Sequence, residues 1–139
     1  MHPPQGLPIR GLNLFEGGNT ATSTAAQTIA LNAYSADIDA GKVRYAVSAW
    51  IGGYAGQEDN AVVTVSFYNA TNAPLGAVKL GPVNAAQRGG TTGLLQRAKS
   101  GSIARGVRKA VARIVITRLQ GTYNDGAVDN IELVLAKKP

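Results

Sequence analysis

Apolar and polar residues alternate along several segments of this chain, and a period of two predicts β-strands. The clearest example is residues 42–54, KVRYAVSAWIGGY. One face of this segment carries Val43, Tyr45, Val47, Ala49 and Ile51, and the other carries Lys42, Arg44, Ala46, Ser48 and Trp50. We therefore expect a half-buried strand here, with the first set turned inward.

The same pattern recurs along the chain, and Gly, Pro, Asn and Asp separate the segments. Strands are predicted at 13–16, 27–34, 42–54, 61–69, 75–80, 93–98, 110–119 and 129–136, and turns or loops at 20–26, 37–41, 85–92 and 120–128. Residues 98–111 have some helical character, but Gly101 and Gly106 interrupt it and favour a turn and a strand. About eight short strands without a predicted helix indicate an all-β fold, an antiparallel β-sandwich of jelly-roll type.

The length of 139 residues fits one domain. Residues 1–12 are predicted to form an extended Pro-rich N-terminal arm, because proline has no amide hydrogen to give to a sheet. The sandwich is assigned to residues 13–136, and residues 137–139 form a basic tail. The start of the chain lacks the basic and apolar regions of a secretory signal, so we expect a product made in the cytoplasm or a mature fragment of a longer chain.

The residue inventory argues against catalysis. The chain has no cysteine and one histidine, His2 in the arm, so a zinc site and a Ser-His-Asp triad are not expected. Phosphate-binding and dinucleotide-binding glycine motifs are absent from the sequence. The acid pairs Glu58/Asp59 and Asp125/Asp129 could in principle serve glycoside hydrolysis, but they fall in predicted turns. We therefore predict that the protein is not an enzyme. No apolar run in the sequence is long enough to cross a membrane.

The net charge is +6, and eight of the 14 basic residues lie between Arg88 and Arg118, a stretch without Asp or Glu. This stretch is either a solvated basic face or a contact surface for an acidic partner. Direct binding of nucleic acid is not favoured, because aromatic residues are not interleaved with the basic ones. The candidate partner-binding residues are Arg10, Arg88, Arg97, Lys99, Arg105, Arg108 and Lys109.

Two turns resemble each other, at residues 53–62 and 121–131. Each follows a long apolar strand and contains a Tyr, a polar turn and Asp-Asn before apolar residues. In a structural interpretation, Asp59 and Asp129 accept backbone amides and hold two hairpin connections. In a functional interpretation, Glu16, Asp125 and Asp129 gather around a calcium ion if the first and last strands pair.

At these turns the chain resembles a known family. The segments SAWIGGY (48–54) with DNA (59–61), GPV (81–83), RGGTTGLL (88–95) and YNDG (123–126) with DN (129–130) are similar to galactose-binding-like jelly rolls. The likeness covers residues 13–136 and is strongest to the F-box-associated sugar-binding domains and their bacterial relatives. Because many members of that superfamily hold a structural calcium near the first and last strands, the resemblance implies Glu16 and Asp129 as ligands. No other cofactor is implied.

As a whole the chain also resembles the cement, or decoration, proteins of tailed bacteriophages. That resemblance implies a structural protein on the virion capsid surface. Such a protein would bind neighbouring major capsid protein subunits and itself, as a dimer. The alternative is a carbohydrate-binding, lectin-like module using Tyr54, Tyr123, Asn124 and Asp125. Trp50 is also available to such a module, but a tryptophan within a strand is more often a core residue, so it is assigned to the core.

Overall fold

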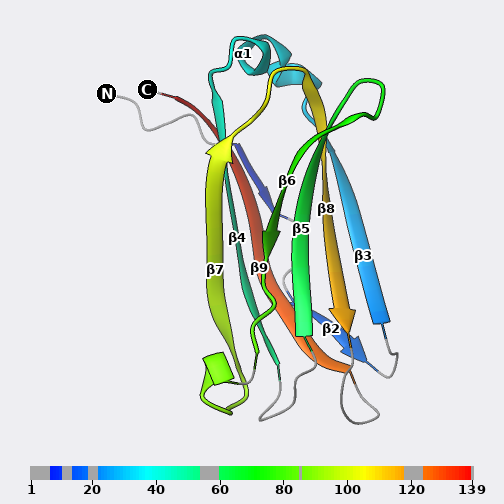
Figure 1. Cartoon of the computed structure of the whole chain (residues 1–139), viewed down its shortest axis with the longest axis vertical. Coiled ribbons are helices and arrows are strands. Elements are labelled where there is room, and N and C mark those ends of the chain that lie inside the picture. The colour runs from blue at the N-terminus through cyan, green and yellow to red at the C-terminus, as the bar shows by residue number, and fades with distance from the viewer. Residues whose placement is uncertain are drawn as a thin grey trace.

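The computed structural model describes residues 7–10, 14–18, 22–53, 60–84, 86–117 and 124–138, which fold into two stacked antiparallel sheets (Figure 1). Sheet A contains β7 (Gly93–Ser102), β4 (Val43–Gly53) and β9 (Asn124–Lys137), with β1 (Leu7–Arg10) and β2 (Leu14–Gly18) both paired to β9. Sheet B has the order β3 (Thr22–Ala30), β8 (Val107–Thr117), β5 (Asn60–Asn69), β6 (Pro74–Leu80). The predicted all-β sandwich of jelly-roll type is confirmed.

The core lies between the sheets and is built from the inward rows of the alternating strands. Val47, Ala49 and Ile51 of β4 are buried, as predicted from the pattern, and Tyr45 of the same row is half-buried. The ring of Tyr45 packs against Phe67 of β5, with 5.2 Å between ring centroids. Burial of these apolar side chains is the main stabilising contribution to such a fold.

Short helical turns occupy the connection from β3 to β4. The 3-10 turn η1 (Asn32–Tyr34) leads into α1 (Ser35–Asp39), and Figure 1 shows α1 at one end of the sandwich. Leu31 and Ile38 are fully buried and anchor this connection on the core. The predicted strand over residues 27–34 was therefore correct only as far as Ala30. The prediction of a simple turn over residues 37–41 was wrong, because α1 extends to Asp39.

The sequence pattern also missed the starts of two strands. Residues 22–26, predicted as a loop, form the first half of β3, and residues 124–128, predicted as a turn, begin β9. Thr22–Ala26 consists of small residues without apolar–polar alternation, in a strand at the edge of sheet B. The Asn-Asp-Gly sequence at 124–126 is a turn signal, but pairing with β2 and β4 keeps this backbone extended.

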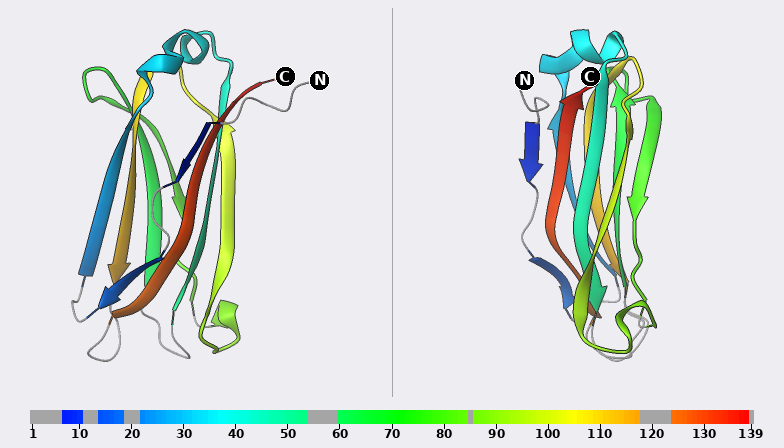
Figure 2. Two further views of the ribbon diagram at one scale, coloured as in Figure 1. Left: turned by 180° about the vertical axis from the view of Figure 1, so that it is seen from behind. Right: turned by 90° about the vertical axis from the view of Figure 1, so that its left-hand side faces the viewer.

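The predicted arm is partly a strand. Leu7–Arg10 pairs with residues 132–135 of β9, and β2 pairs with the other half of the same strand (Figure 2). The expectation of a wholly strand-free arm was wrong, because β1 lies at the edge of sheet A. Edge strands accept a proline such as Pro8, since an edge residue does not need a second ladder partner.

The two similar turns each connect a strand of one sheet to a strand of the other, and not two neighbouring strands of a hairpin. β4 of sheet A leads to β5 of sheet B, and β8 of sheet B leads to β9 of sheet A. The prediction of hairpin connections was therefore wrong, although both segments do join long strands. Asp59 lies outside the described residues, and Asp129 lies within β9.

Neither α1 nor any other helix in the described part of the chain could span a lipid bilayer.

Candidate functional site

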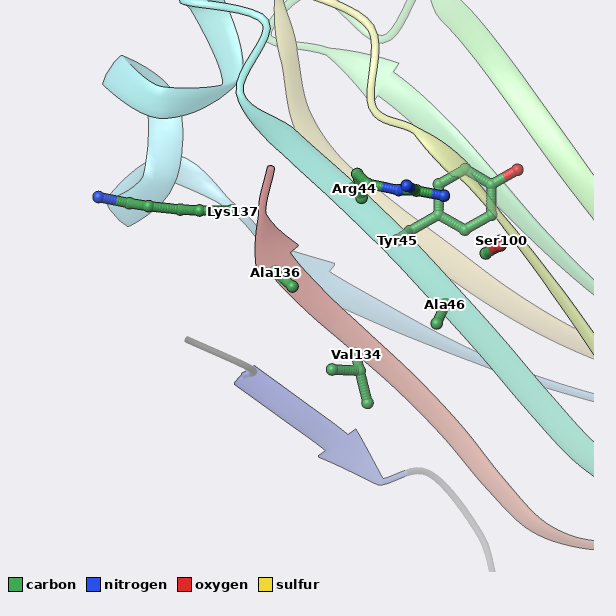
Figure 3. A pocket seen from close by; sticks show the side chains of 7 residues that line it. All are labelled: Arg44, Tyr45, Ala46, Ser100, Val134, Ala136 and Lys137. Atoms are coloured by element: carbon green, nitrogen blue, oxygen red, sulfur yellow. The ribbon is translucent and has the colours of Figure 1, made fainter. Parts of the chain in front are cut away.

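The outer face of sheet A carries a shallow trough across β7, β4 and β9. Two adjoining hollows, of about 310 and 340 Å³, share Ala46, Ser100 and Val134. Figure 3 shows the first of them, with Ala46, Ser100 and Val134 from three neighbouring strands. The described residues that line the trough are Arg44, Tyr45, Ala46, Val47, Ser48, Ala98, Lys99, Ser100, Glu132, Val134, Ala136 and Lys137.

The trough is hollow because its floor is made of small side chains in register. Ala46 lies opposite Ser100 on β7 and opposite Val134 on β9. One step along, Ser48 lies opposite Ala98 and Glu132. Residues directly opposite in a sheet have Cβ atoms about 5 Å apart, so rows of Ala and Ser leave open space above the strands.

Glycines at two points set the shape of β7 against β4. A Cβ on Gly101 would lie 2.8 Å from the Tyr45 hydroxyl oxygen, because the Tyr45 ring lies across that backbone. A Cβ on Gly52 would lie 1.8 Å from the carbonyl oxygen of Gly93, so the two strands approach too closely there for any side chain. Glycine is therefore required where the end of β4 meets the start of β7.

Trp50 lies on the outward row of β4, two residues beyond Ser48. The residue is 38% exposed, and among the described residues it is the one large hydrophobic residue at the surface. In register it is opposite Gln96 of β7 and Asp129 of β9. The assignment of Trp50 to the core was wrong. The alternating pattern had already placed it opposite to the core-facing row, and this was the signal to follow.

Charged groups lie at the ends and rims of the trough. Arg44 is exposed at one end, opposite Ala136. Lys99 of β7 borders the trough in sequence but is opposite the buried Val47, so its side chain lies on the other face of sheet A from Ala98 and Ser100. The Lys137 ammonium lies 3.3 Å from the Asp37 carboxylate of α1, and in Figure 3 its side chain points away from the other lining residues. Glu132 is the single carboxylate among the described lining residues. In register it is opposite Arg10 of β1, whose side chain lies outside the described part.

A second ion pair joins α1 to sheet B. Both terminal guanidinium nitrogens of Arg108 donate to the Asp39 carboxylate, one of them over 3.1 Å, and the amide of Gly106 donates to it over 2.9 Å. The hydrogen bond from Arg108, supported by that from Gly106, lowers the pKa of Asp39 below its ordinary 3.8. The same pair raises the pKa of Arg108. Arg108 is thus engaged within the fold.

The acid-free stretch does not form one basic surface. Arg88 is buried, with 7% of it exposed, and donates to the carbonyls of Thr91 and Val83 over 3.0 and 3.2 Å. It holds the loop between β6 and β7, so its prediction as a contact residue was wrong. Lys109 lies 5.6 Å from the centre of the Tyr68 ring on the outer face of sheet B. Arg97 and Lys99 lie on β7, and Arg105 is exposed in the turn before β8.

The residues predicted for sugar and calcium fall at the far end of sheet A or outside the described part. Asn124 and Asp125 begin β9, at the end of the sheet where Gly52 pairs with Ala127. Tyr54 and Tyr123 lie outside the described residues. Glu16 pairs with Ala127 and Leu14 with Asp129, so the first and last strands do pair. Calcium binding remains a prediction, and the described side chains include no cluster of three or more metal-ligating groups.

No protein-family model and no curated protein matches the chain. Solved structures do. A chain of infectious bursal disease virus, Gx strain, matches 96% of this chain at a TM-score of 0.58 and 12% identity. A family 16 carbohydrate-binding module matches 86% of this chain, with a TM-score of 0.53 and 16% sequence identity. The enzymatically active domain of tailspike protein 4 of bacteriophage CBA120 matches 95% of this chain, with a TM-score of 0.51 and 9% sequence identity.

The lengths of these three proteins differ greatly. This chain spans 32% of the virus chain and 19% of the tailspike chain, but 73% of the carbohydrate-binding module. At such identities the likeness is one of fold. It supports the jelly-roll β-sandwich that the sequence predicts.

Proposed function

We propose that this protein is a non-enzymatic carbohydrate-binding domain, and that a polysaccharide chain lies along the trough of sheet A beside Trp50. The observation that carries the proposal is the exposed Trp50 on the same outward row of β4 as Ala46 and Ser48. A flat aromatic ring offers a large contact area for the apolar face of a sugar ring at small entropic cost.

The trough supplies the other requirements of a site for an extended ligand. Its two hollows adjoin, and each has the volume of a small-ligand site, at least about 300 Å³. The hydroxyls of Ser48 and Ser100 and the guanidinium of Arg44 can hydrogen-bond sugar hydroxyls. Small floor residues let a long ligand pass from one hollow to the next without a clash.

The lining residues favour binding over hydrolysis. Glycoside hydrolysis ordinarily uses two carboxylic groups on either side of the bond to be cleaved. Glu132 has no second carboxylate beside it among the described lining residues. The match to a carbohydrate-binding module of similar length supports the same proposal.

The test is retention of the purified chain on a panel of polysaccharides. The panel should include neutral glucans, xylan and mannan and the acidic polymers alginate and pectin, because Arg44 suits either hydroxyls or carboxylates. We expect saturable binding to at least one polymer and no release of reducing ends. Absence of binding across the panel would refute the proposal.

Capsid decoration is the second candidate function. The fold match to a virus chain supports it, as do Arg97, Lys99 and Arg105, which make no ion pair within the described part of the chain. Such cations suit an acidic capsid surface. In that function the partners are the major capsid protein of a tailed phage and further copies of this chain. Co-sedimentation with capsids, together with a blank polysaccharide panel, would favour it over carbohydrate binding.

A further inference from the structure

Each sheet of the sandwich has two edges, and an edge strand presents unpaired amides and carbonyls to any extended chain. In sheet B the edge strands are β3 and β6. In sheet A they are β7 on one side and β1 with β2 on the other. Natural sheets protect such edges with charges, prolines, bulges or short strands.

Three of the four edges carry this protection. β7 contains Arg97 and Lys99. β6 contains Pro74 and Lys79, and its pairing with β5 shifts register between Phe67 and Tyr68. β1 has four residues including a proline, and β2 has five and a register shift on β9.

The β3 edge has none of these protections. Its nine residues, TSTAAQTIA, include no charge, no proline and no glycine. They pair with β8 from Thr22 to Ala30 without a register shift. Thr24, Ala26 and Thr28 are exposed, and no described segment pairs with the outer side of the strand (Figure 1). β3 is therefore a long, regular strand with a free edge.

We propose that a second copy of this chain binds at this edge, with the two β3 strands antiparallel across a two-fold axis. A strand pairs antiparallel with itself about such an axis, so both copies use the same residues. β3 has no charge that would repel its own copy, whereas β7 would bring Arg97 and Lys99 close to their own copies. It also has no charge that would select an oppositely charged foreign strand.

The dimer has a characteristic salt dependence. Each copy carries a net charge of +6, so repulsion between copies opposes association and salt screens it. A contact between two strand edges buries less than a standard interface, and we expect a Kd on the order of 10–1,000 μM. The trough lies on the outer face of the other sheet, so pairing through β3 leaves it uncovered.

Sedimentation velocity of the full chain over a concentration series tests the proposal. We expect a monomer–dimer equilibrium that strengthens severalfold between roughly 50 and 500 mM salt, because the Debye length shortens about threefold over that range. The double variant T24K/T28K should remain monomeric, because a pairing centred near Ala26 places like charges opposite each other. The matched control T64K/S66K adds the same charge to β5, on the same face but away from the edge, and should still dimerise.

Three outcomes would overturn the proposal. They are a wild-type chain that stays monomeric, a T24K/T28K chain that still dimerises, and equal loss of the dimer in both double variants. If T24K/T28K fails to fold, hydrogen exchange of the wild-type chain decides instead. Amides of β3 should exchange more slowly at high than at low protein concentration, while those of β7 should not change.

Discussion

The outer faces of the two sheets come from the same alternating pattern and have different shapes. On sheet A the central rows consist of Ala46 with Ser100 and of Ser48 with Ala98, and the face is hollow. On sheet B the corresponding rows join Thr24, Val115 and Val62, or Ala26, Arg113 and Thr64. Branched and long side chains cover that sheet, and Lys109 lies over Tyr68.

A strand sequence carries two kinds of information about the surface of its sheet, the periodicity of apolar residues and the size of the outward residues. The period of two assigns residues to faces, and the size of the outward residues decides whether a face can hold a ligand. Both faces also carry an aromatic residue, but Trp50 is exposed beside the trough and Tyr68 is half-buried beneath a cation. The proposed polysaccharide site therefore lies on sheet A alone.

Filling the trough should have the largest effect on that assignment. We expect Ser100→Phe to weaken polysaccharide binding more than about 100-fold, or about 2.7 kcal/mol, because the ring would occupy the shared part of both hollows. Ser66→Phe adds the same ring to the outer face of sheet B and should leave affinity unchanged. Affinity gel electrophoresis measures both. Equal loss in the two variants would remove the distinction between the faces.

Removing the aromatic ring from each face tests the role of stacking. Trp50→Ala should weaken binding about 30-fold, or about 2 kcal/mol, as for a central aromatic contact. Tyr68→Ala should change affinity less than about twofold, because the ring lies on the face without a proposed site. Isothermal titration with a soluble polysaccharide identified by the panel compares them. An unchanged affinity of Trp50→Ala would contradict the proposed site.

The loop between β6 and β7, which Arg88 holds, should contribute to the stability of the fold and not to ligand binding. Arg88 donates to loop carbonyls where the chain leaves sheet B and enters β7, an edge of the trough. Arg88→Ala should lower the free energy of unfolding by about 1–3 kcal/mol, because buried carbonyls lose their donor. Arg97→Ala, on the half-exposed side of β7, should cost less than about 0.5 kcal/mol. Urea unfolding measures both, and similar losses would refute the internal role of Arg88.

The smallest effect concerns the attachment of α1 to the two sheets. Asp39 has a pKa below 3.8 in the folded protein, so its ion pair stabilises the fold above that pH. The contribution is lost as the pH falls through the lowered pKa. Asp39→Asn should therefore reduce the melting temperature slightly at pH 7, and the reduction should become smaller as the pH falls through the lowered pKa. Asp37→Asn removes the ion pair with Lys137 of sheet A and should lower the melting temperature by less. An Asp39→Asn effect that is as large at pH 2 as at pH 7 would contradict this.

The sequence predicted the sandwich because its central strands alternate or are rich in β-branched residues. β4 and β5 alternate between the core and the outer face over most of their length, and β8 carries four β-branched aliphatic residues and a Thr between Ala110 and its end at Thr117. It failed for β1 and the start of β3, because edge strands have less apolar surface to cover and tolerate Pro, Thr and Ala. Asn124–Asp125 begins a strand despite its turn residues, because tertiary pairing outweighs local preference.

The site was harder to predict than the fold. The trough depends on β7, β4 and β9 lying side by side, and these strands are separated by dozens of residues in the chain. Register places Ala46 beside Ser100 and Val134, and periodicity alone gives no register between strands. Trp50 was the exception, because its position outside the core-facing row of β4 was already visible in the sequence. Equally, the run of basic residues from Arg88 to Arg118 gave no indication that Arg88 is buried.

The intrinsic fluorescence of Trp50 tests the central claim most directly, because this residue is the only tryptophan of the chain. During titration with a polysaccharide that the protein retains, we predict a saturable change in emission whose midpoint equals the Kd from an independent binding measurement. Saturable binding with unchanged emission would place the ligand elsewhere on the molecule and contradict the account.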